Sequence, residues 1–414
     1  MSSPSPVDRV GFAAYRVLPR VAGWGYLAAT SLGRLPLSMV PLAILTLAST
    51  ATGSIAVGGL AASAAALGEA IGGPASGALA DRIGQRPVLL VGVVLHLAVL
   101  LSFALSAGVT PDAATIVLAG LAGLSLPQVG ALSRARWLSM APAEVSTAFA
   151  FEGVVDEIVY IIGPALVGIV AVAISPQIAL LTAGALVAVF VTQFAVHRSH
   201  RTVPRRAARD ERDTRPGVSR STRQGALIAV VFVGMLSMGV FFGSSQTGLT
   251  AFASEQGIPG AGALLYAAMA VGSAVTTLSM VLLPERIGTW TRWSLAGAGM
   301  TMGGMLMLFA PNVPLVVAAS LIAGAFQGPL LLTVFGVAGS LAERGRAGIL
   351  MTFTASGVVL GLGVGTALAG VLAEVFGAPG AFAAVVGASA LLLVIGLAAG
   401  AISHRAGARR ADTA

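Results

Sequence analysis

The chain has 414 residues, of which 56% are hydrophobic and only 10% are charged, and its mean hydropathy is +0.92. A soluble domain of this length needs more polar surface than these residues supply, so the composition excludes soluble classes and indicates a membrane protein with many spans. The net charge of +8 would suit a nucleic-acid partner, but the charges lie between the apolar runs, and we expect no such partner.

Residues with catalytic or metal-binding chemistry are scarce. Cysteine is absent, and the four histidines show no spacing typical of a metal site. No G-x-x-x-x-G-K-[ST] phosphate loop occurs, so coupling to ATP is not expected. We therefore predict that the chain is not an enzyme and holds no metal or cofactor.

The first segment, residues 1–22, carries three arginines and lacks a long apolar core. We expect no cleaved signal peptide. From residue 23 onward, apolar runs of about 20 residues or more predict an all-α integral membrane fold with twelve transmembrane helices. The predicted spans are 23–48, 53–80, 88–109, 112–133, 146–173, 177–197, 225–252, 259–283, 293–310, 313–340, 348–374 and 379–402.

The orientation follows from the arginines, because the chain has no lysine. All arginines except Arg34 lie in one set of alternate loops or at the helix ends beside them. This bias predicts a multi-pass protein of the cell (plasma or inner) membrane with both termini in the cytoplasm.

A basic segment between the sixth and seventh spans carries nine arginines and divides the spans six and six. Its polar composition predicts a flexible cytoplasmic linker that contacts anionic lipid headgroups. A shift of 204 residues lays Asp81–Gly84 on Glu285–Gly288 and Gly153–Val155 on Gly357–Val359, which predicts two pseudo-symmetric halves. The predicted division is 1–22, 23–197, 198–224, 225–402 and 403–414.

The turn after the second span has three charged residues among eleven, a density that the apolar runs on either side never approach. It reads Gly77-Ala-Leu-Ala-Asp81-Arg82-Ile-Gly84-Gln85-Arg86-Pro87. Glycine at 77 allows close helix approach, and glycine at 84 allows a left-handed turn. The pattern G-x-x-x-D-R-x-G-x-R resembles the signature loop of the major facilitator superfamily of transporters, with Gln85 where a basic residue is common.

This resemblance covers nearly the whole chain and implies two parallel six-helix halves. It also implies that the turn works as a gate, with Asp81 against the start of the eleventh helix when the inner side is closed. The arginines at 82 and 86 would fix the loop by contacts with acids or lipid phosphates. A positive-inside loop with a helix-capping aspartate is the structural alternative.

Charged residues inside the predicted spans are few, and all lie in the first half. They are Arg34, Glu69, Glu152, Asp156 and Glu157. Each costs about 2.5–3.5 kcal/mol near the centre of a bilayer, so some must face a cavity or a partner. Four acids against one arginine leave at least one acid without a cation, and burial then favours its uptake of a proton.

We predict that the proton-coupling group is Asp156 or Glu157, with Glu69 third. The structural alternative is that Arg34 pairs with Asp156 or Glu157 and only orders helix packing. We expect Glu152, nearer the inner end, to pair with Arg134 or Arg136.

A substrate cavity is predicted from polar stripes and from the matching positions of the second half. The lining residues that we expect are Tyr26, Thr30, Arg34, Ser38, Tyr160, Met238, Phe241, Phe242, Gln246 and Gln327. The first four recur every four residues and so share one helix face. One acidic wall and one apolar, aromatic wall suit an amphiphilic small molecule, and a cationic one fits the acids.

The fifth span contains Gly163-Pro164 followed by Gly168. This resembles the Gly-x-x-x-Gly-Pro-x-x-Gly-Gly signature of proton-driven antiporters in the same superfamily, with valine at 159 and 167 in place of two glycines. The resemblance favours efflux, whereas an ordinary proline kink is the alternative. The arginine common in the fourth helix of the family is absent from 112–133, which offers Pro127 and Gln128.

We therefore predict a monomeric secondary transporter that exports a hydrophobic or amphiphilic small molecule against proton entry. A proton symporter that imports a metabolite is the alternative, and the sign of proton movement distinguishes the two. A transporter-like sensor or scaffold would bind its ligand without flux.

Overall fold

The computed structural model describes residues 15–203, 222–279, 288–341 and 347–411, and these residues contain helices and turns but no strand. The first ten α-helices are α1 Leu18–Ala22, α2 Trp24–Leu32, α3 Leu35–Thr52, α4 Ile55–Ile83, α5 Gln85–Ser106, α6 Asp112–Ser125, α7 Val129–Met140, α8 Val145–Ala173, α9 Pro176–Leu186 and α10 Thr192–Val196. The remaining five are α11 Thr222–Glu255, α12 Gly262–Ser279, α13 Thr289–Leu308, α14 Val313–Leu341 and α15 Ala347–Ala411. A π-helical turn, Val187–Val191, joins α9 to α10.

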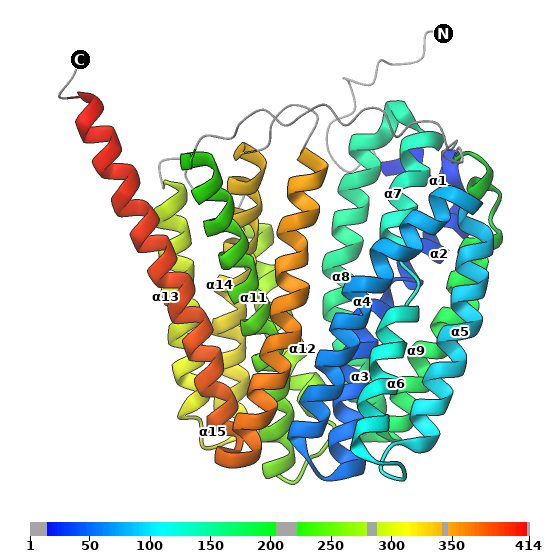
Figure 1. Cartoon of the computed structure of the whole chain (residues 1–414), viewed down its shortest axis with the longest axis horizontal. Coiled ribbons are helices and arrows are strands. Elements are labelled where there is room, and N and C mark those ends of the chain that lie inside the picture. Colours follow the sequence, from blue (N-terminus) through cyan, green and yellow to red (C-terminus); the bar gives the residue numbers. More distant parts are fainter. Residues whose placement is uncertain (1–14, 204–221, 280–287, 342–346, 412–414) are drawn as a thin grey trace.

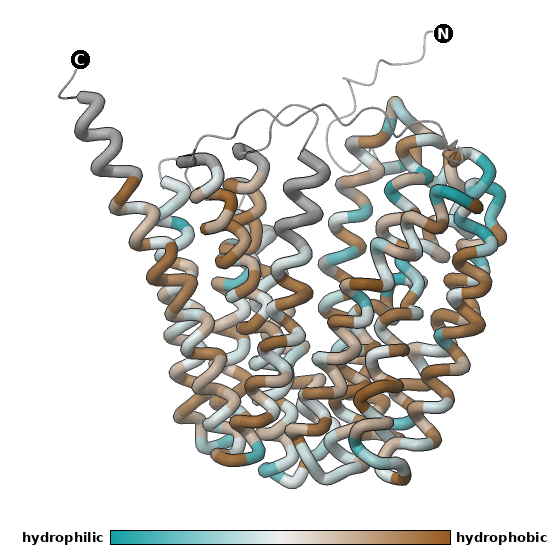
Figure 2. Tube along the Cα trace, viewed as in Figure 1, coloured by the Kyte–Doolittle hydropathy of each residue, from teal (hydrophilic) through white to brown (hydrophobic). Residues whose placement is uncertain are grey.

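Nine segments of the described residues are long and apolar enough to cross a membrane. One of them, Ser356–Ile402, contains a non-helical residue at Gly377, where a turn between two spans is predicted. Hydrophobic residues run along the helices, as Figure 2 shows, and many large apolar side chains face outward, as lipid contact requires. The chain is thus a multi-pass membrane protein whose described residues are nearly all helical, while the count of twelve stays a prediction.

Two predicted spans are broken in the middle, for reasons that the sequence contains. The first is interrupted at Gly33 and Arg34, because Pro36 cannot donate to the carbonyl of Leu32. The fourth is interrupted at residues 126–128, where Leu126 takes the extended conformation that a residue before proline prefers. Each break places a polar side chain, that of Arg34 or Gln128, inside the bundle.

Two predicted helix ends need correction. The fourth span was expected to end at 133, but α7 continues to Met140 and so carries Arg134 and Arg136 within the spanning segment. At the other end of the chain, α15 continues through most of the predicted tail 403–414 and ends at Ala411. The linker predicted at 198–224 begins with a short 3-10 turn, Arg198–Arg201, and residues 204–221 lie outside the described part.

The helices form two groups, α1–α10 and α11–α15, which stand side by side (Figure 1). We call the end of the molecule with the α4–α5 turn the Gly84 end and the opposite end the Gly377 end. The groups pack together at the Gly377 end, where α4 contacts α15 and α8 contacts α12. At the Gly84 end the ribbons of the two groups are apart, and Gly77 has no atom within 4 Å of the position that a Cβ would occupy.

Small residues allow the close contacts between helices. A Cβ on Gly68 of α4 would lie 2.7 Å from the backbone nitrogen of Leu124, and one on Gly370 of α15 would lie 3.2 Å from the Cα of Gly59. Within a bilayer, helix association depends on such close packing, because apolar side chains gain little by leaving lipid. Glycine therefore sets both the packing inside the first group and the contact between groups.

Candidate functional site

A cavity of about 590 Å³ lies between the two groups of helices. This volume falls in the range of roughly 300–1,000 Å³ that is common for small-molecule sites. The residues from the first group that bear on its chemistry are Arg34, Ser38, Glu69, Gln128, Arg134, Asp156 and Tyr160. Those from the second group are Phe242, Gln246, Tyr266, Ser273, Gln327, Leu331, Phe335, Val358 and Leu362.

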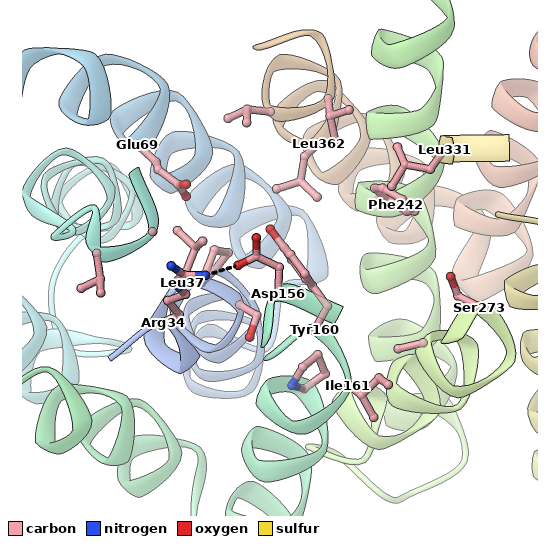
Figure 3. A pocket seen from close by; sticks show the side chains of 18 of the residues that line it. Arg34, Leu37, Glu69, Asp156, Tyr160, Ile161, Phe242, Ser273, Leu331 and Leu362 are labelled. Atoms are coloured by element: carbon pink, nitrogen blue, oxygen red, sulfur yellow. Dashed lines mark hydrogen bonds and ion pairs between the residues drawn. The ribbon is translucent and has the colours of Figure 1, made fainter. Parts of the chain in front are cut away.

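An ion-pair cluster forms the centre of the first-group wall. Arg34 lies at the α2–α3 break, is 2% exposed, and binds both Glu152 and Asp156 of α8. Its Nη1 lies 3.0 Å from Asp156 Oδ1, and Arg134 Nη2 lies 2.5 Å from Asp156 Oδ2. Two arginines therefore balance two carboxylates, and Figure 3 shows the Arg34–Asp156 pair at the cavity wall.

Glu152 is fully buried and its partners differ from those expected. Its carboxylate accepts from Arg34, from the Ser133 hydroxyl at 2.7 Å and from the Trp137 indole at 2.9 Å. Neither Arg134 nor Arg136 bonds to it, so the predicted pairing of Glu152 is wrong. The physical reason is the helix break, which turns the Arg34 guanidinium toward α8 and α7.

Glu69 of α4 lines the same cavity but stands outside this cluster. Among the described residues it has no ion pair and no hydrogen bond. Figure 3 shows its carboxylate apart from Arg34 and Asp156. Glu157 is on α8, and its side chain lies outside the described part of the chain. The unbalanced acid in the described cavity is therefore Glu69.

The second-group wall is mainly apolar. Phe242 and Leu331 face the cavity opposite Asp156 and Tyr160 (Figure 3). The polar groups on this wall are the side chains of Gln246, Tyr266, Ser273 and Gln327. No cation or carboxylate of the described residues lies on it, so the charge of the site comes from the first group.

Four of the ten residues expected to line the cavity are placed elsewhere. Tyr26 is buried in a separate core, where its hydroxyl lies 2.8 Å from Ser133 Oγ. Thr30 is buried beside Arg34 and accepts a hydrogen bond from it. Met238 and Phe241 belong to the main hydrophobic core and are 0% exposed. The helix break changes which face of the first span meets the cavity, so a four-residue stripe could not persist.

The glycine and proline motif of the fifth span is explained by packing. α8 continues through Pro164, which lines the cavity. A Cβ on Gly163 would lie 3.1 Å from the Cβ of Ser38, and the Ser38 hydroxyl donates to the Val159 carbonyl at 2.9 Å. A Cβ on Gly168 would lie 2.7 Å from the backbone nitrogen of Leu264 in α12. Both glycines thus permit close contacts, the second of them between the groups.

The predicted gating turn is exposed at the Gly84 end. Asp81, Arg82 and Arg86 are solvent-accessible and make no ion pair with the described residues. Gly84 has φ 97° and ψ 153°, so it needs glycine but is not in the left-handed helical region that was expected. The segment 342–346, which precedes the expected partner helix, lies outside the described residues, and docking of Asp81 stays a prediction.

Gln85 of the same turn is buried, and its contact with Arg136 explains why a basic residue is not found at this position. Its Oε1 accepts from Arg136 Nε at 2.7 Å. Arg136 also donates to the Phe194 carbonyl and to Ser199, and it has no carboxylate partner among the described residues. A basic residue at 85 would place a second cation beside the buried Arg136, where no described carboxylate balances it.

Several cavity residues were missed from the sequence. Arg134 lies beyond the predicted end of the fourth span at 133, and Gln128 stands out in the sequence only as a polar residue in a span that lacks the arginine common in the family. Tyr266 and Ser273 lie on α12, seven residues apart, and this spacing on one helix face could have indicated them. No group of three or more histidine or acidic side chains gathers as a metal site in the described part of the chain.

Comparison with known families identifies one match: the model described as Major Facilitator Superfamily covers residues 26–313. No curated protein matches the chain. The solved structures with similar folds include a mutant of the nucleoside transporter NupG, with TM-score 0.69, 15% identity, and coverage of 90% of this chain and 99% of that one. The peptide transporter POT in complex with sulfate has TM-score 0.69, 12% identity, and coverage of 96% of both chains.

A bacterial homologue of the iron transporter ferroportin, in an inward-facing state, has TM-score 0.64, 17% identity, and coverage of 94% of this chain and 99% of that one. At these identities the likeness shows the fold alone. Their printed substrates differ from one another, so they do not identify the substrate of this chain.

Proposed function

The chain belongs to the Major Facilitator Superfamily, and from that premise we propose that it exports an amphiphilic small molecule in exchange for protons. Members of this family are transporters and not enzymes. The proposal concerns the finer points: the driving ion, the direction and the kind of substrate.

Glu69 carries the proposal of proton coupling. Of the other three acids named within the spans of the first half, Glu152 and Asp156 have described side chains, and Arg34 and Arg134 balance them. An acid without a cation in the bilayer is costly when charged, so exclusion of water from the cavity favours the protonated form and readmission of water favours release. Glu69 can thus exchange a proton as the cavity opens and closes, and it takes precedence over Asp156 as the coupling group.

In this proposal the two groups of helices move relative to each other. They correspond to the predicted halves, residues 23–197 and 225–402. With the arginine-rich loops in the cytoplasm, the Gly84 end faces inward and the Gly377 end faces outward. The conformation, packed at the Gly377 end, then corresponds to an inward-open state. A cavity reached from inside can load substrate from the cytoplasm or the inner leaflet, as an exporter requires.

The walls of the cavity favour an amphiphilic substrate. Aromatic and aliphatic side chains of the second group supply apolar contact, and the first group supplies the unbalanced carboxylate. The protein would act as a monomer in the cell membrane with both termini cytoplasmic, and the arginines of 198–224 would contact anionic headgroups.

Transport in proteoliposomes with an enclosed pH-sensitive dye tests this function. Addition of a transported compound to wild-type vesicles should move protons in the direction opposite to the compound. The variant Glu69→Gln should lose this proton movement and the uptake driven by a pH gradient, while exchange of labelled for unlabelled compound continues. Exchange survives because it needs cavity access but no net proton transfer.

The matched control is Asp112→Asn, since Asp112 is an exposed acid outside the cavity. It should transport like the wild type. Gradient-driven transport that persists in Glu69→Gln would overturn the role of Glu69, and loss of coupling in Asp156→Asn or Glu157→Gln alone would assign it to α8. Protons and substrate moving together would identify a symporter, and binding without flux a sensor.

A further inference from the structure

Two glutamine side chains on the second-group wall have unused hydrogen-bonding atoms. Gln246 of α11 and Gln327 of α14 both line the cavity, and each is 9% exposed. The Oε1 atom of each is buried without a donor among the described residues. In a folded protein such atoms are rare, because a buried polar group without a hydrogen-bond partner is destabilising.

The surroundings hold these amides at the cavity. Tyr266 of α12 lines the same wall as Gln246, yet no donor among the described residues bonds to the Gln246 oxygen. Next to Gln327, Gly328 allows α14 to pack on α12, since a Cβ there would lie 3.0 Å from the Ser273 carbonyl. Phe242, Leu331 and the other apolar lining residues offer no donor to either oxygen. Neither oxygen has a donor among the described residues, and both side chains line the cavity, so a molecule bound there can supply the missing donors.

We propose that Gln246 and Gln327 accept hydrogen bonds from N–H or O–H groups of the substrate, so that the transporter selects compounds with a donor-bearing head on an apolar body. This inference rests on the proposed function, because it places the substrate in this cavity. It adds a requirement that is separate from charge: Glu69 attracts any cation, whereas an amide oxygen distinguishes a primary amine from a quaternary one. A site that is built to bind a donor rejects the analogue without it, because its own polar atoms are then left unpaired.

Matched pairs of probes separate donor recognition from charge. Phenylbutylamine and its N,N,N-trimethyl derivative carry the same charge and body, but only the first has N–H donors on nitrogen. Phenylbutanol and its methyl ether form a neutral pair that differs in one O–H donor. Binding is measured by equilibrium dialysis against the full chain in lipid nanodiscs without a proton gradient.

The wild type should bind the donor-bearing member of each pair more tightly, by about tenfold for the amines, as expected for a hydrogen bond from a charged donor. Gln246→Leu and Gln327→Leu should each reduce that preference by weakening only the donor-bearing compound. Gln177→Leu makes the same change at an exposed site at the start of α9 and should keep the wild-type preference. Should a leucine variant fail to fold, Gln→Met at the same position carries the same expectation.

Equal affinities within both pairs for the wild type, including equal absence of binding, would overturn the inference. So would glutamine variants that weaken both members of a pair alike, since the amides would then act in helix packing only. The proposed function is tested separately, so a failure of proton coupling and a failure of this inference give different results. Intact donor preference with no proton movement in vesicles would contradict proton coupling and leave the inference standing.

Discussion

Arg34 is the residue on which the charge balance of the cavity wall depends. Its removal in Arg34→Ala would leave the fully buried Glu152 carboxylate with two neutral donors and no cation. An uncompensated buried charge of this kind costs about 3–5 kcal/mol, so we expect a large fall in thermal stability in detergent. The double variant Arg34→Ala/Glu152→Gln should regain much of the loss, because the stranded charge is removed.

Arg134→Ala serves as the comparison, since the Arg134 side chain is 40% exposed and should affect stability much less. A double variant as unstable as Arg34→Ala would show that Arg34 acts through water or substrate instead of through Glu152.

Gln85 gives a second prediction about a single residue. Gln85→Arg would place a cation beside the buried Arg136 and should lower the melting temperature more than Gln85→Leu, which removes only the hydrogen bond. The exchange Gln85→Arg/Arg136→Gln should recover stability, because the same pair of groups is present with the positions reversed. Thermal unfolding followed by tryptophan fluorescence measures all three. Equal stability of Gln85→Arg and the wild type would mean that the side chain at 85 reaches solvent.

Among the elements, α4 and α15 form the contact that holds the Gly377 end closed. A side chain at Gly370 would meet the backbone of α4, with its Cβ 3.1 Å from the Ile55 carbonyl oxygen. We expect Gly370→Val to push α4 and α15 apart and to expose the part of the cavity nearest the Gly377 end. The rate at which a membrane-impermeant maleimide labels Ser63→Cys, whose hydroxyl in the native chain lies near Gly363, should rise.

Gly387→Val is the control, because it also lies on α15 and nothing is within 4 Å of its Cβ position. Labelling should stay at the wild-type rate in this variant. Unchanged labelling in Gly370→Val would show that the contact adapts and does not set the closed state.

At the scale of the whole molecule, the two ends of the α4–α15 pair offer matching contacts. At the Gly377 end, Glu374 Oε2 accepts from Ser54 Oγ at 3.1 Å and from the Ala56 amide at 3.2 Å, so an acid of α15 caps the start of α4. At the Gly84 end, Asp81 near the end of α4 would cap the start of the eleventh helix in the same way. The first contact is formed and the second is predicted for the opposite state.

Spin labels test this reciprocity, and the absence of native cysteine makes site-specific labelling simple. Glu374→Gln should lengthen distances between positions 52 and 376 and shorten those between 83 and 347. Asp81→Asn should do the reverse, with a shift in population of up to about tenfold, because a charge–dipole contact is lost at one end only. Distances unchanged in both variants would mean that each acid only caps a local turn.

The sequence by itself determined the class and family of this protein. Hydropathy, arginine placement and the motif around Asp81 act through the bilayer or through a local turn, so they can be read without knowing which helices meet. The sequence could also name Arg34, Asp156, Phe242, Gln246 and Gln327 as cavity residues, because polar and aromatic groups inside membrane spans are unusual.

Only the tertiary structure decided which of these groups are paired. The breaks at 33–34 and 126–128 rotate the helix segments on their two sides relative to one another, so Glu152 meets Arg34, Arg134 meets Asp156, and Tyr26 lies in a separate core. Helical periodicity assumes an unbroken helix, and it does not predict which neighbouring helix packs against each face. Glu69 remained without a cation for the same reason: ion pairs between helices depend on rotation and depth, which long-range packing sets.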